Sequence, residues 1–332
     1  MLKDLVNKDM EDKKISESKY LLSDKNIRKL YEYNFKRSSN NIAIKALSGG
    51  LKSAVYLIED NKSKIVLKIA PKYNKSTISV DNNTLWWEVE MLKKMEEINF
   101  PSPKVLAYDS SCSICHVPYF FMTYLDGENY LEIKDKLNEE QQKQIEYEIG
   151  ALSFAICKAP SNQFFLPSEP QLKFSNNYEF IFHLFDLLLT DARNHNVDLG
   201  ENGCKRIFGI LEEKKDSINN IDNLCYVNTD MWDGNILIKD GHISGIVDFA
   251  DIYCCDEIMT FYFHTIDGKL SESFLKGYNK SNLSYDEMTR IEIYRMYVIL
   301  KMIIECKIKE YGRFDWMYDN LSERMKILNK TK

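Results

Sequence analysis

The sequence lacks the features of membrane-spanning and exported proteins. Among its 332 residues there is no run of 18 apolar residues, so we expect no segment that crosses a bilayer. The opening segment, MLKDLVNKDMEDKK, is charged and has no apolar core of the kind that signal peptides carry. We therefore expect a cytoplasmic protein in which the eight scattered cysteines are reduced.

An excess of positive charge is also missing. Lys and Arg together number 44 and Asp and Glu number 50, which gives a net charge of −6. This balance disfavours a nucleic-acid partner, because proteins that bind phosphate backbones usually present a basic face. It is compatible with a cationic small molecule. The hydrophobic share of 44% is ordinary for a globular protein, and the length predicts about two domains, with no repeats between them.

The cysteines do not have the spacing of a metal or haem site. Cys112, Cys115 and His116 match the C-x-x-C-H pattern of haem attachment, but that attachment requires export. A zinc site would require a second spaced pair, whereas Cys254 and Cys255 are adjacent. We therefore interpret the segment around Cys112 as a surface turn between two strands.

The first part of the chain is predicted to form a five-stranded antiparallel sheet with one helix inserted after the third strand. Short runs rich in β-branched and aromatic residues are separated by turn residues and by Pro71. Apolar residues recur at helical spacing over residues 84–97, and again around Ile27 and Leu30. The five expected strands cover residues 42–47, 54–58, 64–70, 105–108 and 118–124.

The rest of the chain is predicted to be mostly helical. The exception is a small β-hairpin within residues 225–250. The clearest helices cover residues 139–159, 177–194 and 285–311. A strand-rich part followed by a helix-rich part favours an α+β fold with two lobes, which we divide into residues 1–125 and 126–332.

The strongest chemical signal lies in that hairpin. An apolar strand is followed by Asp240-Gly241, a dipeptide that tight hairpin turns prefer, and a second strand then returns. Asn235 precedes the outgoing strand and Asp248 follows the returning one. Because an antiparallel hairpin brings its open ends together, we expect Asn235, Asp248 and the loop that carries Asp230 to converge.

Three oxygen-bearing side chains at one place suit Mg²⁺, which takes few protein ligands and leaves positions for substrate phosphates. Asp248 would chelate the ion, Asn235 would hold a second one, and Asp230 would orient an acceptor hydroxyl and take its proton. An Asp five residues before an Asn, followed by a metal-binding Asp, also matches the catalytic loop of protein kinases. The alternative interpretation is a hairpin whose polar ends only cap turns.

These motifs resemble those of the aminoglycoside phosphotransferase family, which shares the protein-kinase-like fold with choline kinases and fructosamine kinases. Family members show His-Gly-Asp-Leu-x-x-Gly-Asn followed by Ile-Asp-Trp or Ile-Asp-Phe. Here residues 228–235 read Asn-Thr-Asp-Met-Trp-Asp-Gly-Asn, and residues 247–249 read Val-Asp-Phe. The resemblance extends over roughly residues 25–320 and includes a hinge-like phrase at 119–127. It implies a bilobal protein-kinase-like fold and a magnesium-dependent kinase.

The resemblance also implies how a nucleotide would be bound in the first lobe. Lys68 on the third strand would contact the α- and β-phosphates of ATP or GTP, and Glu88 of the inserted helix would pair with Lys68. Glu90 is the rival partner, because positions two apart on a helix do not share a face. The alternative for these charges is an ordinary solvated position.

A nucleotide loop and a hinge follow from the same resemblance. The loop lacks the full Gly-x-Gly-x-x-Gly pattern, but its backbone N–H groups could still cradle phosphates. The loop would be Ser48-Gly49-Gly50-Leu51-Lys52-Ser53, in which Ser48, Gly49 and Gly50 are the candidate binding residues. The hinge would read the nucleotide base through backbone groups, and it would consist of Met122, Thr123 and Leu125.

Two positions depart from the family pattern. Asn228 stands where the family has a His that supports the loop of the metal-binding Asp. Asn also forms hydrogen bonds, so the loop can keep its support, although turnover could be reduced. Ile156-Cys157 stands where the family often has Leu-His, which removes a supporting contact.

The resemblance implies an acceptor site in the second lobe, facing Asp230. Acidic residues there would favour a cationic, polyamine-like sugar through charge-assisted hydrogen bonds, although each alone is more typical of a solvated surface. The candidates are Asp251, Glu257, Glu305 and Glu310, with Asp315 as a further acidic residue. Asp256 is expected instead to support the loop after the metal-binding strand.

Three functions remain open from the sequence. The first is a kinase for a hydroxyl of a small molecule, such as an aminoglycoside-type antibiotic, whose modification would give antibiotic resistance. The second is a metabolic kinase for choline, a ketosamine or another sugar. The third is a nucleotide-binding regulator with little catalysis, which Asn228 alone supports. A protein substrate is disfavoured, because the residues after Asp248 leave little room for a long activation loop.

Overall fold

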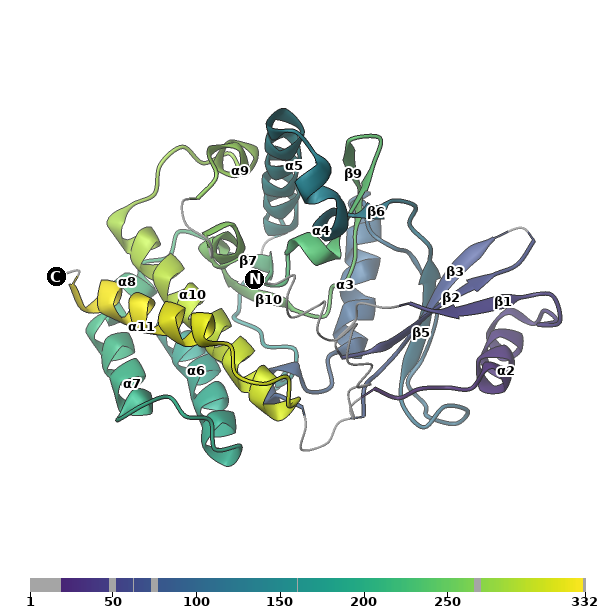
Figure 1. Ribbon diagram of the computed structural model, residues 1–332, viewed down its shortest axis with the longest axis horizontal. Helices are drawn as coiled ribbons and strands as arrows, with labels where there is room; N and C mark the ends of the chain where they lie inside the picture. The colour runs from purple at the N-terminus through teal and green to yellow at the C-terminus, as the bar shows by residue number, and fades with distance from the viewer. Residues whose placement is uncertain are drawn as a thin grey trace.

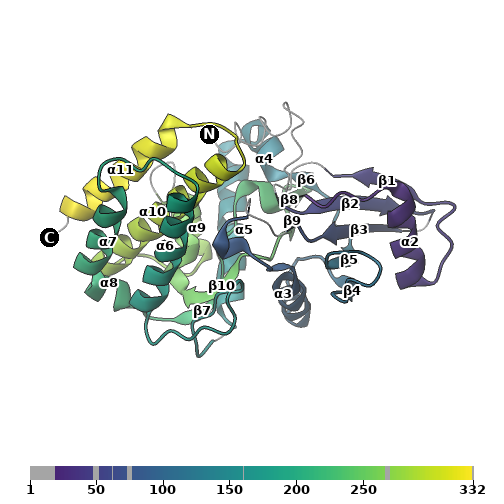
Figure 2. The same ribbon diagram turned by 90° about the horizontal axis from the view of Figure 1, so that it is seen from below.

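An antiparallel sheet forms the first part of the molecule and lies at one end of it (Figures 1 and 2). The computed structural model describes residues 19–47, 52–61, 63–72, 77–159, 161–265 and 270–330. The strand order is β1-β2-β3-β5-β4, which places β3 in the middle. The strands are β1 (Ala43–Ala46), β2 (Ala54–Glu59), β3 (Lys64–Ile69), β4 (Val105–Asp109) and β5 (Tyr119–Thr123).

Two helices bury the opposite faces of this sheet. Val66 belongs to the core that also contains the apolar face of α3 (Leu85–Glu97), whereas Leu67 belongs to the core beneath α2 (Asp24–Phe35). Side chains alternate along a strand, so Lys68 lies on the same face as Val66. The sheet therefore directs Lys68 toward α3.

The second part of the molecule is mostly helical (Figure 1). Its α-helices are α4 (Tyr130–Ile133), α5 (Glu139–Cys157), α6 (Asn177–Asn194), α7 (Gly203–Glu213), α8 (Lys215–Asn219), α9 (Glu272–Gly277), α10 (Tyr285–Ile308) and α11 (Asp315–Lys330). In the described residues, the 3-10 segments of this part are η2 (Lys134–Lys136), η3 (Asp233–Asn235) and η4 (Glu257–Thr265), whereas η1 (Ser79–Asp81) precedes α3 in the first part. The long helix α10 begins with a capping box at Ser284 and packs against α6, α8, α11 and η4.

Two small sheets carry the polar loops of this helical part. In one, β8 pairs with β9 as a hairpin and β6 joins at the edge of β8. In the other, β7 pairs with β10 in antiparallel register, with Asn228 opposite Ile252. The strands are β6 (Glu128–Asn129), β7 (Leu224–Asn228), β8 (Ile236–Lys239), β9 (His242–Ile246) and β10 (Ile252–Asp256).

The predicted α+β class is confirmed, with a five-stranded antiparallel sheet and a helical second part. The five sheet strands begin and end within one residue of the predicted bounds, and α10 ends three residues earlier than predicted. The β7–β10 sheet was not predicted, because its two strands are separated by the whole hairpin and because β10 is fully buried rather than alternating. The division at residues 125 and 126 remains our proposal.

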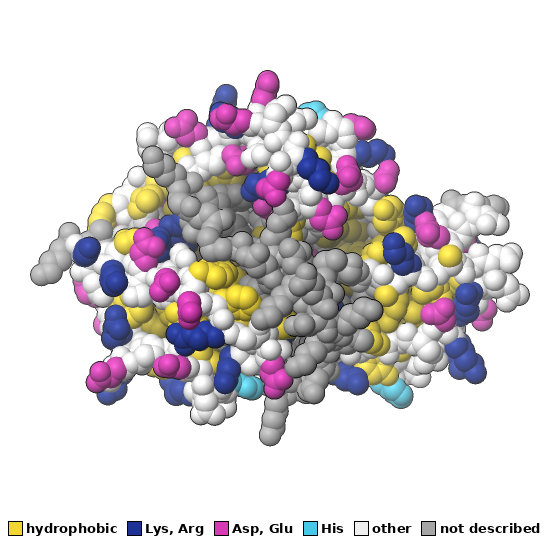
Figure 3. Space-filling view, in the orientation of Figure 1, with side chains coloured by type: hydrophobic (Ala, Val, Ile, Leu, Met, Phe, Trp, Pro, Cys, Tyr) yellow, Lys and Arg dark blue, Asp and Glu magenta, His cyan; other side chains and the backbone are white. Residues whose placement is uncertain are grey.

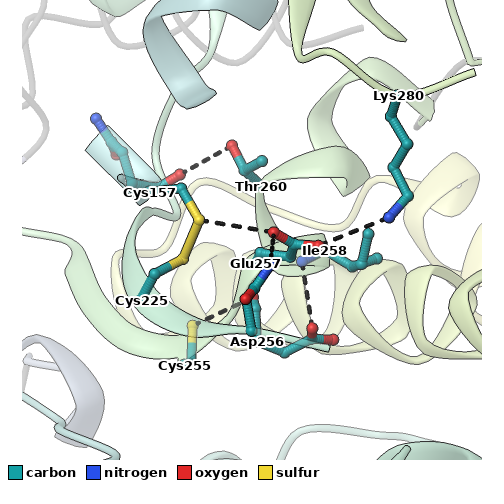
Figure 4. The surroundings of a disulfide bond; sticks show 10 residues. Cys157, Cys225, Cys255, Asp256, Glu257, Ile258, Thr260 and Lys280 are labelled. Carbon is teal, nitrogen blue, oxygen red and sulfur yellow. Dashed lines mark hydrogen bonds and ion pairs between the residues drawn. A yellow bond between two sulfur atoms is a disulfide. The ribbon is translucent and has the colours of Figure 1, made fainter. Parts of the chain in front are cut away.

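A disulfide joins two elements of the second part, and it corrects the expectation that all cysteines are reduced. Cys157 at the end of α5 is bonded to Cys225 of β7, and their Cα atoms are 5.1 Å apart (Figure 4). That separation lies in the range that a disulfide spans without backbone movement. Sequence could not indicate this pair, because 68 residues separate the two cysteines.

The surface shows mixed charge. On the face that Figure 3 displays, the acidic and basic side chains of the described residues are interspersed rather than gathered into patches of one sign. The segment around Cys112 lies between β4 and β5, where Cys112 is exposed and Cys115 is buried. Within the described segments, each helix is too short or too polar to cross a bilayer.

Candidate active site

The loop after β7 is held by hydrogen bonds to Asp251, Tyr262 and Asn228. Thr229 donates from its backbone N and its Oγ1 to the carbonyl oxygen of Asp251, at 3.0 and 2.7 Å. The hydroxyl of Tyr262 donates to the carbonyl oxygen of Thr229. Asn228 accepts a 2.8 Å hydrogen bond from the backbone N of Asp230 through its Oδ1. These bonds fix the backbone that leads into Asp230.

Asn235 ties this loop to the β8–β9 hairpin. Its Nδ2 donates to the carbonyl oxygen of Asp230 at 2.9 Å and to Oδ2 of the same residue at 2.8 Å. Its carbonyl oxygen accepts a 2.9 Å hydrogen bond from the backbone N of Val247. Because Val247 immediately precedes Asp248, the open end of the hairpin brings Asp230, Asn235 and Asp248 to one place.

Gly234 is required by the packing of the same loop. A Cβ atom added at Gly234 would lie 2.3 Å from the indole ring of Trp232, so the ring lies directly against the glycine. Asn129 donates to the carbonyl oxygen of Gly234 at 2.7 Å, and Lys134 forms an ion pair with Asp233 at 2.9 Å. Contacts from α4 and its flanking residues therefore hold the turn that leads into Asn235.

Lys68 connects the sheet to the hairpin. Its Nζ lies 2.7 Å from Oε1 of Glu88 on α3 and 3.0 Å from Oδ1 of Asp248. The side chains of Lys68 and Glu88 are 8% and 2% exposed, whereas that of Asp248 is 40% exposed and can reach a ligand. Glu90, the rival partner, lies on the exposed face of α3 and pairs with Lys93.

Asp248 has an unusual backbone. Its φ is +66°, in the left-handed region that residues with a Cβ rarely adopt. The next residue, Phe249, is completely buried and packs edge-to-face against Phe100. The buried Phe249 ring and the Lys68 ion pair hold the backbone in this conformation and direct the Asp248 carboxylate toward Lys68.

The pKa shifts at the site follow from burial and from the neighbouring charges. Burial raises the pKa of Glu88 to about 7, against the opposing effect of Lys68. Desolvation is the largest single effect on Asp248, but the ion pair and hydrogen bond with Lys68, together with Lys52 and a backbone hydrogen bond from Ala250, outweigh it, so the pKa of Asp248 lies below its ordinary value. Burial, and then the carboxylates of Asp251 and Asp248, raise the pKa of Asp230 well above its ordinary value. Asp230 is therefore a stronger base than an ordinary carboxylate.

The remaining nucleotide-binding candidates are placed as follows. Ser48, Gly49 and Gly50 lie outside the described residues. Met122 and Thr123 end β5, where Met122 is buried opposite Val66 of β3. Leu125 packs against Gly245 of β9, since a Cβ atom on that glycine would lie 2.4 Å from Cδ1 of Leu125. Thr123 and Leu125 therefore flank the connection between the two parts.

The acidic acceptor candidates are not brought together as one group. The buried Asp251 lies beside the loop of Asp230, and Glu305 of α10 forms an ion pair with Lys309, which follows the helix. Glu257 instead accepts a 2.9 Å hydrogen bond from Asn223, near the disulfide (Figure 4). The other two are exposed: Glu310 follows α10, and Asp315 begins α11 and pairs with Arg313.

Asp256 joins β10 to α10 rather than facing the loop of Asp230. Its Oδ2 accepts 2.7 Å hydrogen bonds from Nε of Arg290 and from the hydroxyl of Tyr294. All three side chains are buried, so the carboxylate satisfies a guanidinium that would otherwise be costly to bury. Asp256 thus supports the end of the strand that follows Asp248.

Sequence reasoning missed a cluster of two lysines and two aspartates. Lys52, before β2, lies 2.8 Å from Asp81 and 3.4 Å from Asp251. Lys301 of α10 lies 2.8 Å from the same Asp81 and 3.5 Å from Asp251. Asp81 lies in η1, a segment with no motif of its own, so no spacing in the sequence pointed to this cluster.

The oxygen ligands at the open end of the hairpin are too few to hold a metal ion without other ligands, but they are sufficient for Mg²⁺. Among the described residues, no group of three or more His, Cys, Asp or Glu side chains is arranged to hold a metal ion. Asp248 and Asn235 offer two oxygen ligands, and Mg²⁺ characteristically takes one or two from the protein and the rest from phosphates and water. The residues present therefore fit an ion that arrives with a nucleotide.

The fold is shared with several solved structures. A candidate fructosamine-3-kinase from Thermobifida fusca superposes with a TM-score of 0.66 at 14% identity, covering 90% of this chain and 98% of the other. An aminoglycoside phosphotransferase in ternary complex with streptomycin and ATP gives 0.60 at 17% identity, covering 92% and 97%. Another, in complex with GDP and kanamycin, gives 0.64 at 12% identity, covering 91% and 97%.

At these identities the structural matches show the protein-kinase-like fold, and the sequence match is needed for the family. No curated protein matches the chain in sequence. The model of the phosphotransferase enzyme family matches residues 43–293, a range that contains Lys68, Glu88, Asp230, Asn235 and Asp248. Since this range is well over half of the 332 residues, the chain belongs to the phosphotransferase enzyme family.

Proposed function

We propose that this protein transfers the γ-phosphoryl group of ATP or GTP to a hydroxyl group of a small molecule. The observation that carries the proposal is the meeting of the buried Lys68–Glu88 pair with Asp248, beside Asp230 and Asn235. This arrangement combines a cation for phosphates, oxygen ligands for a metal ion and a carboxylate base. Family membership supports the reaction class.

Each residue has a distinct part in the proposed reaction. Lys68, oriented by Glu88, would bind the α- and β-phosphates, while Asp230 accepts the proton of the acceptor hydroxyl. The acceptor oxygen forms a new bond to the γ-phosphorus as the bond from that phosphorus to the bridging oxygen of the leaving diphosphate breaks. The raised pKa of Asp230 makes its carboxylate a better proton acceptor.

Asp248 and Asn235 would hold Mg²⁺. The ion, when bound, would neutralise phosphate charge during transfer. The 40% exposed side chain of Asp248 is compatible with this role, since its second oxygen is not needed by Lys68.

The acceptor class follows less directly from the site. Structural relatives include complexes with aminoglycosides as well as candidate fructosamine kinases, so both the antibiotic and the metabolic alternatives stay in the proposal. Modification of an aminoglycoside would make the protein a resistance enzyme acting in the cytoplasm. Asp251 and Glu305 are already paired with lysines, which favours an acceptor that does not depend on many ammonium groups.

The test is an acceptor screen with the purified protein and Mg-ATP or Mg-GTP. Mass spectrometry should detect a product that has gained one phosphate, from a panel of aminoglycosides, choline, ketosamines and sugars. Asp230→Ala should abolish this product while nucleotide binding persists. Full turnover by Asp230→Ala would show that the base is another residue. Nucleotide binding without transfer to any acceptor would favour the regulator instead.

A further inference from the structure

The ammonium group of Lys52 lies close enough to Asp230 and Asp248 to act electrostatically on both carboxylates. Lys52 lies two residues before the start of β2, in which Val55 is the cross-strand partner of Lys68. Its Nζ contacts Asp251, whose carbonyl oxygen holds Thr229, the neighbour of Asp230. Asp251 is also three residues from Asp248. Lys52 therefore reaches across the site from the side of Lys68 to the side of Asp230 and Asp248.

The two aspartates that hold Lys52 do not depend on it. Lys301 contacts Asp81 at 2.8 Å and Asp251 at 3.5 Å. Lys301 is 14% exposed and anchored on α10, whereas the Lys52 side chain is 36% exposed and sits on a short segment before a strand. If Lys52 moved away, Lys301 would still partly neutralise both buried carboxylates. Of the two lysines, Lys52 is thus the more exposed and is not anchored on a helix.

We propose that Lys52 is a catalytic residue that leaves Asp81 and Asp251 and binds the transferred γ-phosphoryl group when a nucleoside triphosphate binds. This inference rests on the function proposed above and adds a second phosphate-binding cation to Lys68. Its ammonium would neutralise charge on the γ-phosphate oxygens while the phosphorus passes from the diphosphate oxygen to the acceptor oxygen. Lys52 itself exchanges no proton and forms no covalent bond.

The charge balance of the cluster supports this exchange. Two lysines and two aspartates are neutral together, so the departure of Lys52 leaves one negative charge, which lies near Lys301. A triphosphate carries several negative charges and offers Lys52 more attraction than the two shared carboxylates. The electrostatic influence of Lys52 already reaches both Asp230 and Asp248, where it favours the ionised carboxylates.

The experiment compares nucleotides that differ at the γ-position. Full-length wild type, Lys52→Met and Lys52→Arg are titrated calorimetrically with Mg·AMP-PNP and with Mg·ADP. Loss of a cation that contacts only the γ-phosphate should weaken AMP-PNP binding by about tenfold and leave ADP binding within about twofold. Lys52→Arg should restore most of the lost AMP-PNP affinity. Lys64→Met, an exposed lysine of the neighbouring β3 paired with Glu59, serves as the matched control.

Each outcome decides the matter. Equal weakening of both nucleotides, or of neither, in a folded Lys52→Met protein would overturn the role of Lys52 and leave the proposed function standing. Wild type that binds neither nucleotide would overturn the proposed function and this inference together. If Lys52→Met does not fold, Lys52→Gln and Lys52→Arg provide the same comparison, and retention of full AMP-PNP affinity by Lys52→Gln would contradict the inference.

Discussion

Lys68 is shared by two carboxylates of different exposure. Glu88 is fully buried on α3, while Asp248 is open to solvent and to ligands. One ammonium group cannot fully neutralise both carboxylates. The free-energy penalty of an incompletely neutralised charge is larger for Glu88, because water does not reach it. Burial accordingly raises the pKa of Glu88 to about 7. The buried Glu88 carboxylate therefore lowers the stability of the folded protein once it is ionised.

Glu88→Gln should make the protein more stable at pH 8 and less active. A carboxyl whose pKa rises from 4.5 to about 7 on folding costs stability once pH exceeds the unfolded value, and the cost is complete above the folded value. The gain in unfolding free energy at pH 8 should reach about 1–3 kcal/mol and vanish below about pH 4.5. Urea unfolding across this pH range provides the measurement.

Glu90→Gln is the control for that series, since Glu90 is exposed on the same helix. It should change stability by less than about 0.5 kcal/mol at every pH. A Glu88→Gln protein that is less stable than wild type at pH 8 would show that the ion pair with Lys68 outweighs the cost of burial.

Asn228→Ala should reduce turnover more than it reduces nucleotide affinity. The change removes the acceptor for the backbone N–H of Asp230 and leaves that donor without its partner, at a cost of about 1–3 kcal/mol. We expect kcat to fall about tenfold or more, because the position of the base is relaxed while Lys68 is untouched. Steady-state kinetics on the acceptor found by the screen would measure this.

Asn228→His provides the comparison, since a ring nitrogen of His could accept the same hydrogen bond. Partial recovery of kcat in this variant would support the hydrogen bond as the cause. Unchanged kcat and unchanged thermal stability in Asn228→Ala would contradict it.

Among the elements, α5 and β7 are linked by a covalent bond as well as by packing. Cys157 ends α5, and Cys225 lies three residues before Asn228, at which β7 ends and the loop of Asp230 begins. Neighbouring Glu257 accepts a hydrogen bond from Asn223 and forms an ion pair with Lys280 (Figure 4). The strand that leads into the candidate active site is therefore anchored at its start.

Reducing this bond should lower the thermal stability of the protein. A link across 68 residues removes unfolded-state entropy worth roughly 4 kcal/mol by the chain-entropy model, and measured values usually range from about 2 to 5 kcal/mol. Dithiothreitol should therefore lower the unfolding temperature of wild type. A Cys157→Ala/Cys225→Ala variant should begin at that lower temperature and not respond to the reductant. If dithiothreitol lowered the unfolding temperature of this variant as much as that of wild type, the Cys157–Cys225 bond could not be the cause.

Helices and strands could be predicted where a short stretch of sequence carries its own periodicity or turn residues. The five sheet strands, α3 and the β8–β9 hairpin each depend on short periodic runs and turn residues, and the hairpin alone brought Asn235 near Asp248. Helices α4, α7, α8, α9 and α11 were not predicted. Their segments are short or rich in charge, and each packs against other elements of the second part.

At the scale of the whole molecule, the two parts are joined by polar contacts beside the candidate site. Ser79 of η1 donates from its backbone N and its Oγ to Asp191 of α6, at 2.8 and 2.7 Å. Trp87 of α3 donates from Nε1 to the carbonyl oxygen of Ile252 in β10. These contacts place η1, and with it Asp81, against the helical part.

Asp191→Ala should weaken this connection. It leaves the backbone N–H and hydroxyl of Ser79 without their acceptor, which should cost about 1–3 kcal/mol of unfolding free energy. Ser79→Ala removes only the hydroxyl bond, and the two changes should be non-additive because they share an interaction. Asp216→Ala, at an exposed carboxylate of α8, is the control. Additive effects of Asp191→Ala and Ser79→Ala would contradict a direct bond.

Contacts between distant segments were beyond reach of the sequence. Lys52 and Lys301 meet at Asp81 because η1, the segment before β2 and α10 come together only in the folded chain. Nothing in their local patterns distinguishes these charges from solvated ones. The family resemblance supplied Lys68 and Glu88 in advance, but its motifs contain no counterpart for a cluster that spans both parts.

The Cys157–Cys225 bond also bears on how the protein is prepared. Material from a reducing host and material refolded in air would be chemically distinct molecules, alike in sequence but differing at the root of the strand that supports Asp230. Kinetic constants from one batch would then describe only that batch. The free thiols of every preparation should therefore be titrated before its activity is measured, to show whether the bond is formed.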